Sequence, residues 1–112
     1  MNQISHQELQ TLINSGHVTL IEALAQPHYA AGHLPGALNL PGPLTADLAT
    51  TLAPDKTRTL VTYCSGPACA RSKIAAAAFT RLGYPDVRVY AEGKAGWHAA
   101  GLPLHTTHAS VG

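Results

Sequence analysis

Apolar residues recur at helical spacing near the start of the chain, at Leu9, Leu12 and Ile13. Ser5, followed three residues later by Glu8, has the pattern of a capping box, in which each side chain accepts a hydrogen bond from the backbone N–H of the other residue. Gly16 is typical of the position just past a helix end. These signals predict a first helix between Ser5 and Gly16.

Four short runs are rich in apolar, β-branched and aromatic residues, which favour strands. They cover residues 18–24, 37–40, 59–64 and 86–91. Helical patterns occupy the segments 44–52, 70–83 and 94–103. Thr45 or Asp47 is suited to cap the start of the helix over 44–52.

The predicted helix over 70–83 is rich in alanine, so it can lie close against a sheet. We expect its buried stripe to consist of Ile74, Ala75, Ala78 and Leu82. Strands that alternate with helices predict an α/β fold, in which helices cover both faces of a parallel sheet. Ligands of such sheets bind beyond the carboxyl ends of the strands. The loop after the strand over 59–64 is therefore the expected place for chemistry.

A chain of 112 residues, of which 46% are apolar, is long enough to form one globular domain. We expect a single domain over 1–112, with a core of about 5–103 and a flexible tail over 104–112. The formal net charge of +1 and the lack of a Lys/Arg run argue against a nucleic-acid partner. No apolar run is long enough to span a membrane, and the first residues lack the pattern of a signal peptide. We therefore expect a cytoplasmic protein that is a monomer or a weak dimer.

Both cysteines lie in the stretch "YCSGPACARSK", residues 63–73. Cys64 stands at the end of a predicted strand, just before a predicted helix. The start of a helix carries a partial positive charge, and Arg71 adds a full one. Such surroundings lower a thiol pKa from about 8.5 to roughly 3.5–7.5. We therefore interpret Cys64 as a nucleophile with a lowered pKa.

The loop after Cys64 exposes mostly backbone, because its side chains are small. Successive N–H groups that turn inward form an anion-binding nest, which a helix start and an arginine strengthen. The candidate substrate-binding residues are Ser65, Gly66, Pro67, Ala68, Cys69, Ala70, Arg71 and Ser72. Ser72 is suited either to cap the helix or to donate a hydrogen bond to the sulfur. A nucleophilic sulfur beside a bound oxyanion suits sulfur transfer, hydrolysis of phosphate esters or reduction of arsenate.

Cys69 has two interpretations. It is either a small residue that fills the loop, or a resolving thiol that attacks an oxidised or persulfidated Cys64 and forms a disulfide. A zinc site needs three or four ligands, and the two cysteines supply two. The seven histidines are scattered, and only His105 and His108 have a ligand-like spacing. We therefore expect no metal and no cofactor.

Three segments, one of which contains the two cysteines, follow one another along the chain: "HYAAGHLPGALNLP", "LVTYCSGPACARSKIAAAAFTRLGY" and "VRVYAEGKAGWHAAGLP". Together they resemble the single-domain rhodaneses, the thiosulfate sulfurtransferase family, from Ser5 to Pro103. The resemblance implies a three-layer rhodanese-like fold, in which helices flank a five-stranded parallel sheet. It also implies that Cys64 takes sulfur from thiosulfate as a persulfide and passes it on. The implied partners are a small anionic sulfur donor and a cyanide or thiol acceptor.

The active-site loop departs from the common rhodanese pattern. Arg71 and Ser72 stand seven and eight residues after Cys64, whereas the family usually has such a pair at five and six. The chain thus resembles a subgroup with an extended C-x-G-P-x-C loop. Because a longer loop admits a larger oxyanion, a cysteine-dependent phosphatase or arsenate reductase stays open as an alternative. A non-catalytic rhodanese-like interaction module is a second alternative, against which the presence of the cysteine argues.

A second departure concerns Glu22, which stands where the family usually has an aspartate. The arginine that usually follows has no counterpart, so we expect a structural ion pair to be missing. We interpret His33 and Trp97 as structural residues. Gly93 and Lys94 are expected near the mouth of the pocket, where Lys94 would attract anions.

Overall fold

The computed structural model describes residues 2–106 of the chain. Its helices are α1 (His6–Ser15), α2 (Gln26–Ala31), α3 (Ala46–Leu52), α4 (Arg71–Arg81) and α5 (Gly93–Ala99). Its strands are β1 (Asn2–Gln3), β2 (Val18–Glu22), β3 (Leu38–Asn39), β4 (Thr59–Tyr63) and β5 (Val87–Val89). No helix within the described residues is both long and apolar enough to cross a membrane.

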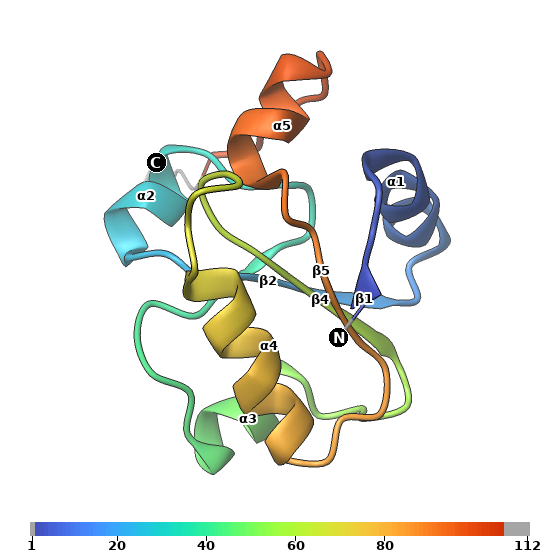
Figure 1. Cartoon of the computed structure of the whole chain (residues 1–112), viewed down its shortest axis with the longest axis vertical. Helices are drawn as coiled ribbons and strands as arrows, with labels where there is room; N and C mark the ends of the chain where they lie inside the picture. Colours follow the sequence, from blue (N-terminus) through green and yellow to red (C-terminus); the bar gives the residue numbers. More distant parts are fainter. Residues whose placement is uncertain (1, 107–112) are drawn as a thin grey trace, which may run out of the picture.

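The five strands form one sheet in the order β1-β5-β4-β2-β3, and all neighbouring strands run parallel. The predicted α/β fold with a five-stranded parallel sheet is confirmed. β4 lies at the centre of the sheet, so the loop that follows it starts from a strand that is hydrogen-bonded on both sides (Figure 1). The pattern of apolar residues did not predict β1 or α2, because two strand residues and six helix residues are too few to show a period.

Helices cover both faces of the sheet. On one face, α3 and α4 enclose a core that includes Ile21, Leu60 and Phe79. On the other face, α1 and α5 enclose a core that includes Leu9 and Trp97. Successive side chains of a strand point to opposite faces, so neighbouring residues of β4 contribute to different cores.

The predicted ends of α1 and α3 are confirmed. Ser5 and Glu8 form the capping box, with both backbone-to-side-chain hydrogen bonds at 3.2 Å. Gly16 ends α1 in the left-handed conformation, at φ 76°. Thr45, rather than Asp47, caps α3, because its hydroxyl accepts the N–H of Leu48 at 3.1 Å.

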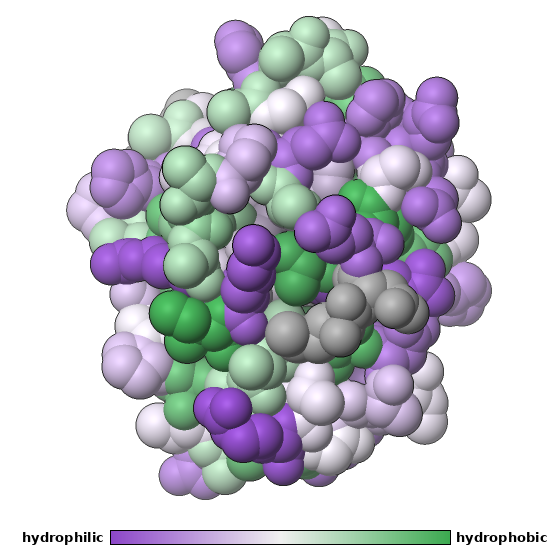
Figure 2. Space-filling view, viewed as in Figure 1, coloured by the Kyte–Doolittle hydropathy of each residue, from purple (hydrophilic) through white to green (hydrophobic). Residues whose placement is uncertain are grey.

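The predicted buried stripe of α4 is wrong. Ile74 is 65% exposed, and the residues that α4 buries are Ser72, Ala75, Ala76 and Phe79. Phe79 is the largest apolar residue of this helix, and its burial rotates Ile74 toward solvent. In the space-filling view of this face, apolar surface lies around α4, interrupted by hydrophilic side chains (Figure 2).

The predicted flexible tail starts at residue 104, but residues 104–106 still contact the domain. His105 pairs with His33 through two backbone hydrogen bonds, of 2.7 and 2.8 Å. Leu104 packs against the core that α1 and α5 cover. The rest of this prediction, residues 107–112, lies outside the described residues.

Candidate active site

The loop between β4 and α4 lies beside the start of α5 (Figure 1). The carbonyl groups of Cys64 and Ser65 accept hydrogen bonds from the backbone N–H groups of Lys94 and Ala95, at 2.9 and 2.8 Å. Within the loop, the N–H of Cys69 donates to the carbonyl of Gly66 at 3.1 Å. Backbone bonds to α5 therefore fix the first half of the loop, and a tight turn shapes the second half.

Gly93 permits this close contact. Its φ of 64° lies in the left-handed region, which side chains other than that of glycine rarely adopt. A Cβ atom on this residue would lie 2.6 Å from the carbonyl oxygen of Cys64 and 2.7 Å from the backbone nitrogen of Gly66. Gly93 was expected near the pocket mouth, but this role was not predictable, because nothing in the sequence distinguishes it from the other glycines.

The Cys64 side chain is buried and points toward the start of α4. Its sulfur lies 3.5 Å from the hydroxyl oxygen of Ser72, and its S–H donates to the carbonyl oxygen of Cys69 at 3.4 Å. Ser72 does not cap α4, since the N-cap residue is Ala70. Of the two predicted roles of Ser72, the geometry therefore fits the contact with the sulfur.

The prediction that the pKa of Cys64 is lowered is wrong. Burial raises the pKa of this thiol, and its hydrogen bond with the thiol of Cys69 raises it further. The hydroxyl and the backbone N–H of Ser72 act in the opposite direction but do not outweigh these effects. The prediction rested on the positive charge at the helix start, and it did not include the cost of removing a thiolate from water.

The sulfur of Cys69 occupies the nest that was predicted for a substrate anion. Although partial burial raises the pKa of Cys69, four hydrogen bonds to its sulfur lower the pKa overall. The donors are the thiol of Cys64, the backbone N–H groups of Arg71 and Ser65, and the hydroxyl of Ser65. Cys69 is thus the thiol that ionises more readily in this pair.

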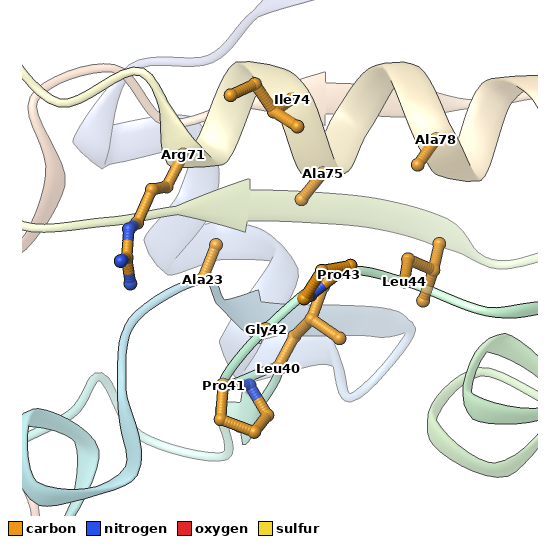
Figure 3. A pocket seen from close by; sticks show the side chains of 10 residues that line it. All are labelled: Ala23, Leu40, Pro41, Gly42, Pro43, Leu44, Arg71, Ile74, Ala75 and Ala78. Carbon is orange, nitrogen blue, oxygen red and sulfur yellow. The ribbon is translucent and has the colours of Figure 1, made fainter.

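Arg71 lines a cavity to which neither cysteine contributes. Its side chain extends from the start of α4 toward Ala23 and lines a cavity of about 240 Å³ (Figure 3). The other walls of this cavity are apolar: Leu40, Pro41, Gly42, Pro43, Leu44, Ile74, Ala75 and Ala78. Arg71 therefore lines a different cavity from Ser65 of the loop, although the two residues were expected in one site.

A larger cavity of about 540 Å³ opens beside the loop. It is lined by Leu24, His28, Ser65, Lys94, Ala95, His98 and Leu104. None of these lining residues is acidic, and Lys94 lines the cavity as expected. The amine of Lys94 is already paired, however, so its charge is only partly available to an incoming anion.

The structural ion pair that was expected to be missing is present. The carboxylate of Glu22 is fully buried and accepts hydrogen bonds from the hydroxyl of Tyr63 at 2.7 Å and from the amine of Lys94 at 3.1 Å. The same amine donates to the carbonyl of His28 at 2.9 Å. Lys94 therefore supplies the cation that we sought directly after the first predicted strand, and it reaches Glu22 from the start of α5.

His33 and Trp97 are structural residues, as predicted. The ring of His33 stacks on Tyr29 with the centroids 4.0 Å apart, and its Nδ1 lies 2.9 Å from the carbonyl oxygen of Tyr29. Trp97 is buried and donates from Nε1 to the carbonyl of Pro103 at 2.8 Å. Within residues 2–106, no three His, Cys, Asp or Glu side chains are grouped so that they could hold a metal ion.

Comparison with known proteins identifies the domain family. A model of the Rhodanese-like domain family matches residues 5–100. The HTH-type transcriptional regulator Rv0324 of Mycobacterium tuberculosis is 35% identical over 101 residues, which cover 90% of this chain and 43% of the regulator. The chain thus spans less than half of that relative.

Two solved structures are similar over most of the chain. The BH2092 protein of Bacillus halodurans is 27% identical, with a TM-score of 0.86, and the match covers 95% of this chain and 77% of that one. The human single-domain sulfurtransferase TSTD1 is also 27% identical, with a TM-score of 0.72 and coverage of 88% and 96%. The similarity therefore extends over most of the fold.

Proposed function

The chain belongs to the rhodanese-like domain family, and we propose that it is a sulfurtransferase that carries sulfane sulfur as a persulfide on Cys64. The observation that carries this proposal is the position of Cys64, whose sulfur lies at the start of α4 within reach of the hydroxyl of Ser72. The likeness to the human single-domain sulfurtransferase supports the same reaction class.

The first half of the reaction is a displacement at sulfur. The Cys64 thiolate attacks the outer sulfur of thiosulfate, a new S–S bond forms, and the S–S bond of thiosulfate breaks. Sulfite leaves with the electron pair, and a persulfide remains on Cys64. The second half passes the sulfur to cyanide or to a thiol.

The raised pKa of Cys64 requires a proton acceptor for this step. Cys69 is suited to this role, because its sulfur hydrogen-bonds to the thiol of Cys64 and ionises first. Transfer of the proton from Cys64 to Cys69 generates the attacking thiolate at the buried position. The larger cavity, with Lys94 and His98 in its walls, is the proposed route for the anionic donor.

The length of the loop no longer favours a phosphatase or an arsenate reductase. The additional loop residues accommodate Cys69, whose sulfur interacts with the backbone N–H groups of Ser65 and Arg71. A larger oxyanion would compete with this sulfur for the same donors. Free thiols at both positions fit a reducing compartment, so we propose a cytoplasmic location.

Sulfite release and intact-protein mass spectrometry test the proposal. After exposure to thiosulfate, we expect wild type to release sulfite, Cys69→Ser to release it more slowly because the proton acceptor of Cys64 is lost, and Cys64→Ser to release none. The Cys69→Ser chain gains one sulfur atom, which cyanide removes. The proposal fails if no variant releases sulfite, and it is replaced if the wild type instead reduces arsenate or cleaves a phosphate ester.

A further inference from the structure

The two cysteines of the loop are in direct contact. They stand five positions apart, and each thiol is near enough to shift the pKa of the other. A turn in which Cys69 donates to the carbonyl of Gly66 brings them together. The S–H of Cys64 also donates to the carbonyl oxygen of Cys69 at 3.4 Å, so both the backbone and the side chain of Cys69 adjoin the Cys64 sulfur.

The surroundings of Cys69 stabilise a thiolate. Its sulfur accepts hydrogen bonds from two backbone N–H groups and from the hydroxyl of Ser65. A cysteine that only fills space in a loop has no need of such donors, whereas an attacking sulfur does. These contacts favour a chemical role for Cys69.

We propose that Cys69 resolves the persulfide of Cys64: its thiolate attacks the Cys64 sulfur, a Cys64–Cys69 disulfide forms, and the sulfane sulfur leaves as hydrosulfide. The proton that Cys69 took from Cys64 first passes to the outer sulfur of the persulfide, which frees the Cys69 thiolate and supplies the proton of the hydrosulfide. This inference rests on the proposed function, which supplies the persulfide. The S–S bond of the persulfide breaks, and its electron pair leaves with the hydrosulfide. Both cysteine sulfurs are oxidised and the sulfane sulfur is reduced, so no external oxidant is needed. A dithiol reductant then restores the two thiols.

The position of the contact selects the atom that is attacked. The carbonyl oxygen of Cys69 lies 3.4 Å from the sulfur of Cys64 itself, which becomes the inner sulfur of the persulfide. Attack there yields the disulfide, whereas attack on the outer sulfur would only move the persulfide to Cys69.

Burial also favours an internal reaction. Cys64 is 1% exposed, so the loop must open for the donor to reach it. An external acceptor would require a second opening in each turnover. Cys69 is already in contact and requires none. A dithiol reductant of the disulfide therefore completes the turnover, and cyanide or an external thiol competes with Cys69 for the persulfide.

The test follows the fate of the sulfur in a single turnover. Reduced wild type, Cys69→Ser and Cys64→Ser are exposed to thiosulfate, quenched with an alkylating agent at successive times and weighed intact, while released sulfide is trapped and measured. Ile74→Ser serves as a control, because this exposed residue of the same helix keeps both thiols. Far-ultraviolet circular dichroism confirms that each variant is folded.

We expect wild type and Ile74→Ser to release one equivalent of sulfide and to end two hydrogen atoms lighter, with no thiol left to alkylate. Cys69→Ser keeps the additional sulfur on Cys64 and releases no sulfide. Two results overturn the inference: a wild-type persulfide on Cys64 that lasts as long as the one in Cys69→Ser, or a persulfide found on Cys69 beside a free Cys64.

A second arm separates this inference from the proposed function. Inorganic polysulfide replaces thiosulfate and loads Cys64 without any sulfurtransferase reaction. If thiosulfate fails in every variant, while polysulfide gives a disulfide and sulfide in wild type only, the proposed function is wrong and the resolving role of Cys69 stands. If polysulfide leaves a lasting persulfide on wild-type Cys64, the resolving role is wrong whatever thiosulfate does.

Discussion

Tyr63 and Cys64 are neighbours at the end of β4, yet they belong to two different environments. The hydroxyl of Tyr63 donates to the buried carboxylate of Glu22, on the face that α1 and α5 cover. The sulfur of Cys64 meets Ser72 of α4, which covers the opposite face. The alternation of side chains along a strand thus separates two groups of residues. One is the carboxylate cluster, formed by Glu22, Tyr63 and Lys94. The other is the thiol pair, Cys64 and Cys69.

The two environments differ in how they are held together. The carboxylate cluster uses bonds of 2.7 and 3.1 Å, one of them an ion pair, between segments that are far apart in sequence. The thiol pair uses sulfur contacts of 3.4 and 3.5 Å within one loop and the helix that follows it. Charge-assisted bonds are about twice as strong as neutral ones, so the cluster stabilises the fold while the thiols keep the freedom to react.

The largest effect is expected when the carboxylate cluster loses its cation. Lys94→Met leaves the Glu22 carboxylate buried without a counter-charge, which costs about 3–5 kcal/mol of the free energy of unfolding. Denaturant unfolding measures the change. Adding Glu22→Gln to this variant removes the unpaired charge and restores most of the loss.

Arg58→Met is the matched control for Lys94→Met. Arg58 pairs with Asp55 at 3.8 Å, and both side chains are largely exposed, so this loss is worth about 0–1 kcal/mol. Equal effects of Arg58→Met and Lys94→Met would contradict the structural importance of the buried cluster.

The next effect concerns the contact between α5 and the loop. Gly93→Ala forces a side chain into the left-handed region, at a cost of about 1–3 kcal/mol, and drives a Cβ atom into the backbone of Cys64 and Gly66. We expect both the free energy of unfolding and the rate of sulfite release from thiosulfate to fall.

Gly16→Ala separates the cost of the left-handed backbone from the cost of the Cβ clash. Gly16 has a similar φ of 76°, but no atom lies within 4 Å of the Cβ position. This variant therefore bears the backbone cost of about 1–2 kcal/mol and keeps the rate of sulfite release. A Gly93→Ala chain that releases sulfite as fast as Gly16→Ala would show that the loop tolerates displacement.

The comparison also explains what the sequence could predict. Hydrophobic spacing repeats along the longer helices and strands, so their positions and the parallel sheet were predictable, as was the place of Cys64 at a strand end. The buried face of α4 was not, because the packing of Phe79 decides which way Ile74 turns.

The site was predictable only as far as local sequence determines it. Lys94 stands 72 positions from Glu22, so no local pattern identifies it as the missing cation. The direction of Arg71 and the occupation of the nest by Cys69 depend on how the loop curls. Burial of Cys64, which reverses the predicted direction of its pKa shift, follows from the tertiary fold alone.

The titration of the two thiols tests this reversal. Alkylation follows the thiolate, so we expect Cys69 to react with a midpoint at lower pH than an ordinary cysteine and Cys64 with a midpoint at higher pH. Peptide mass spectrometry after alkylation at a series of pH values gives both midpoints.

Cys69→Ala identifies the source of the shift in Cys64. It removes the interaction that adds to the effect of burial, so the midpoint of Cys64 falls toward the ordinary value. A wild-type Cys64 that reacts at lower pH than Cys69 would support the original prediction, in which the helix start dominates.

The smallest effect concerns Tyr90, a second buried tyrosine on the face of the carboxylate cluster. The hydroxyl of Tyr63 has hydrogen-bond partners, whereas the hydroxyl of Tyr90 has none within residues 2–106. Burial, together with the nearby Glu92, raises the pKa of Tyr90 to about 12. An unpaired buried hydroxyl costs about 1–3 kcal/mol, so Tyr90→Phe should raise the free energy of unfolding by about 1 kcal/mol. Tyr63→Phe, which removes a donor from Glu22, should lower it. If denaturant unfolding shows both substitutions to be destabilising, the Tyr90 hydroxyl has a partner such as a buried water, and the two tyrosines serve the same purpose.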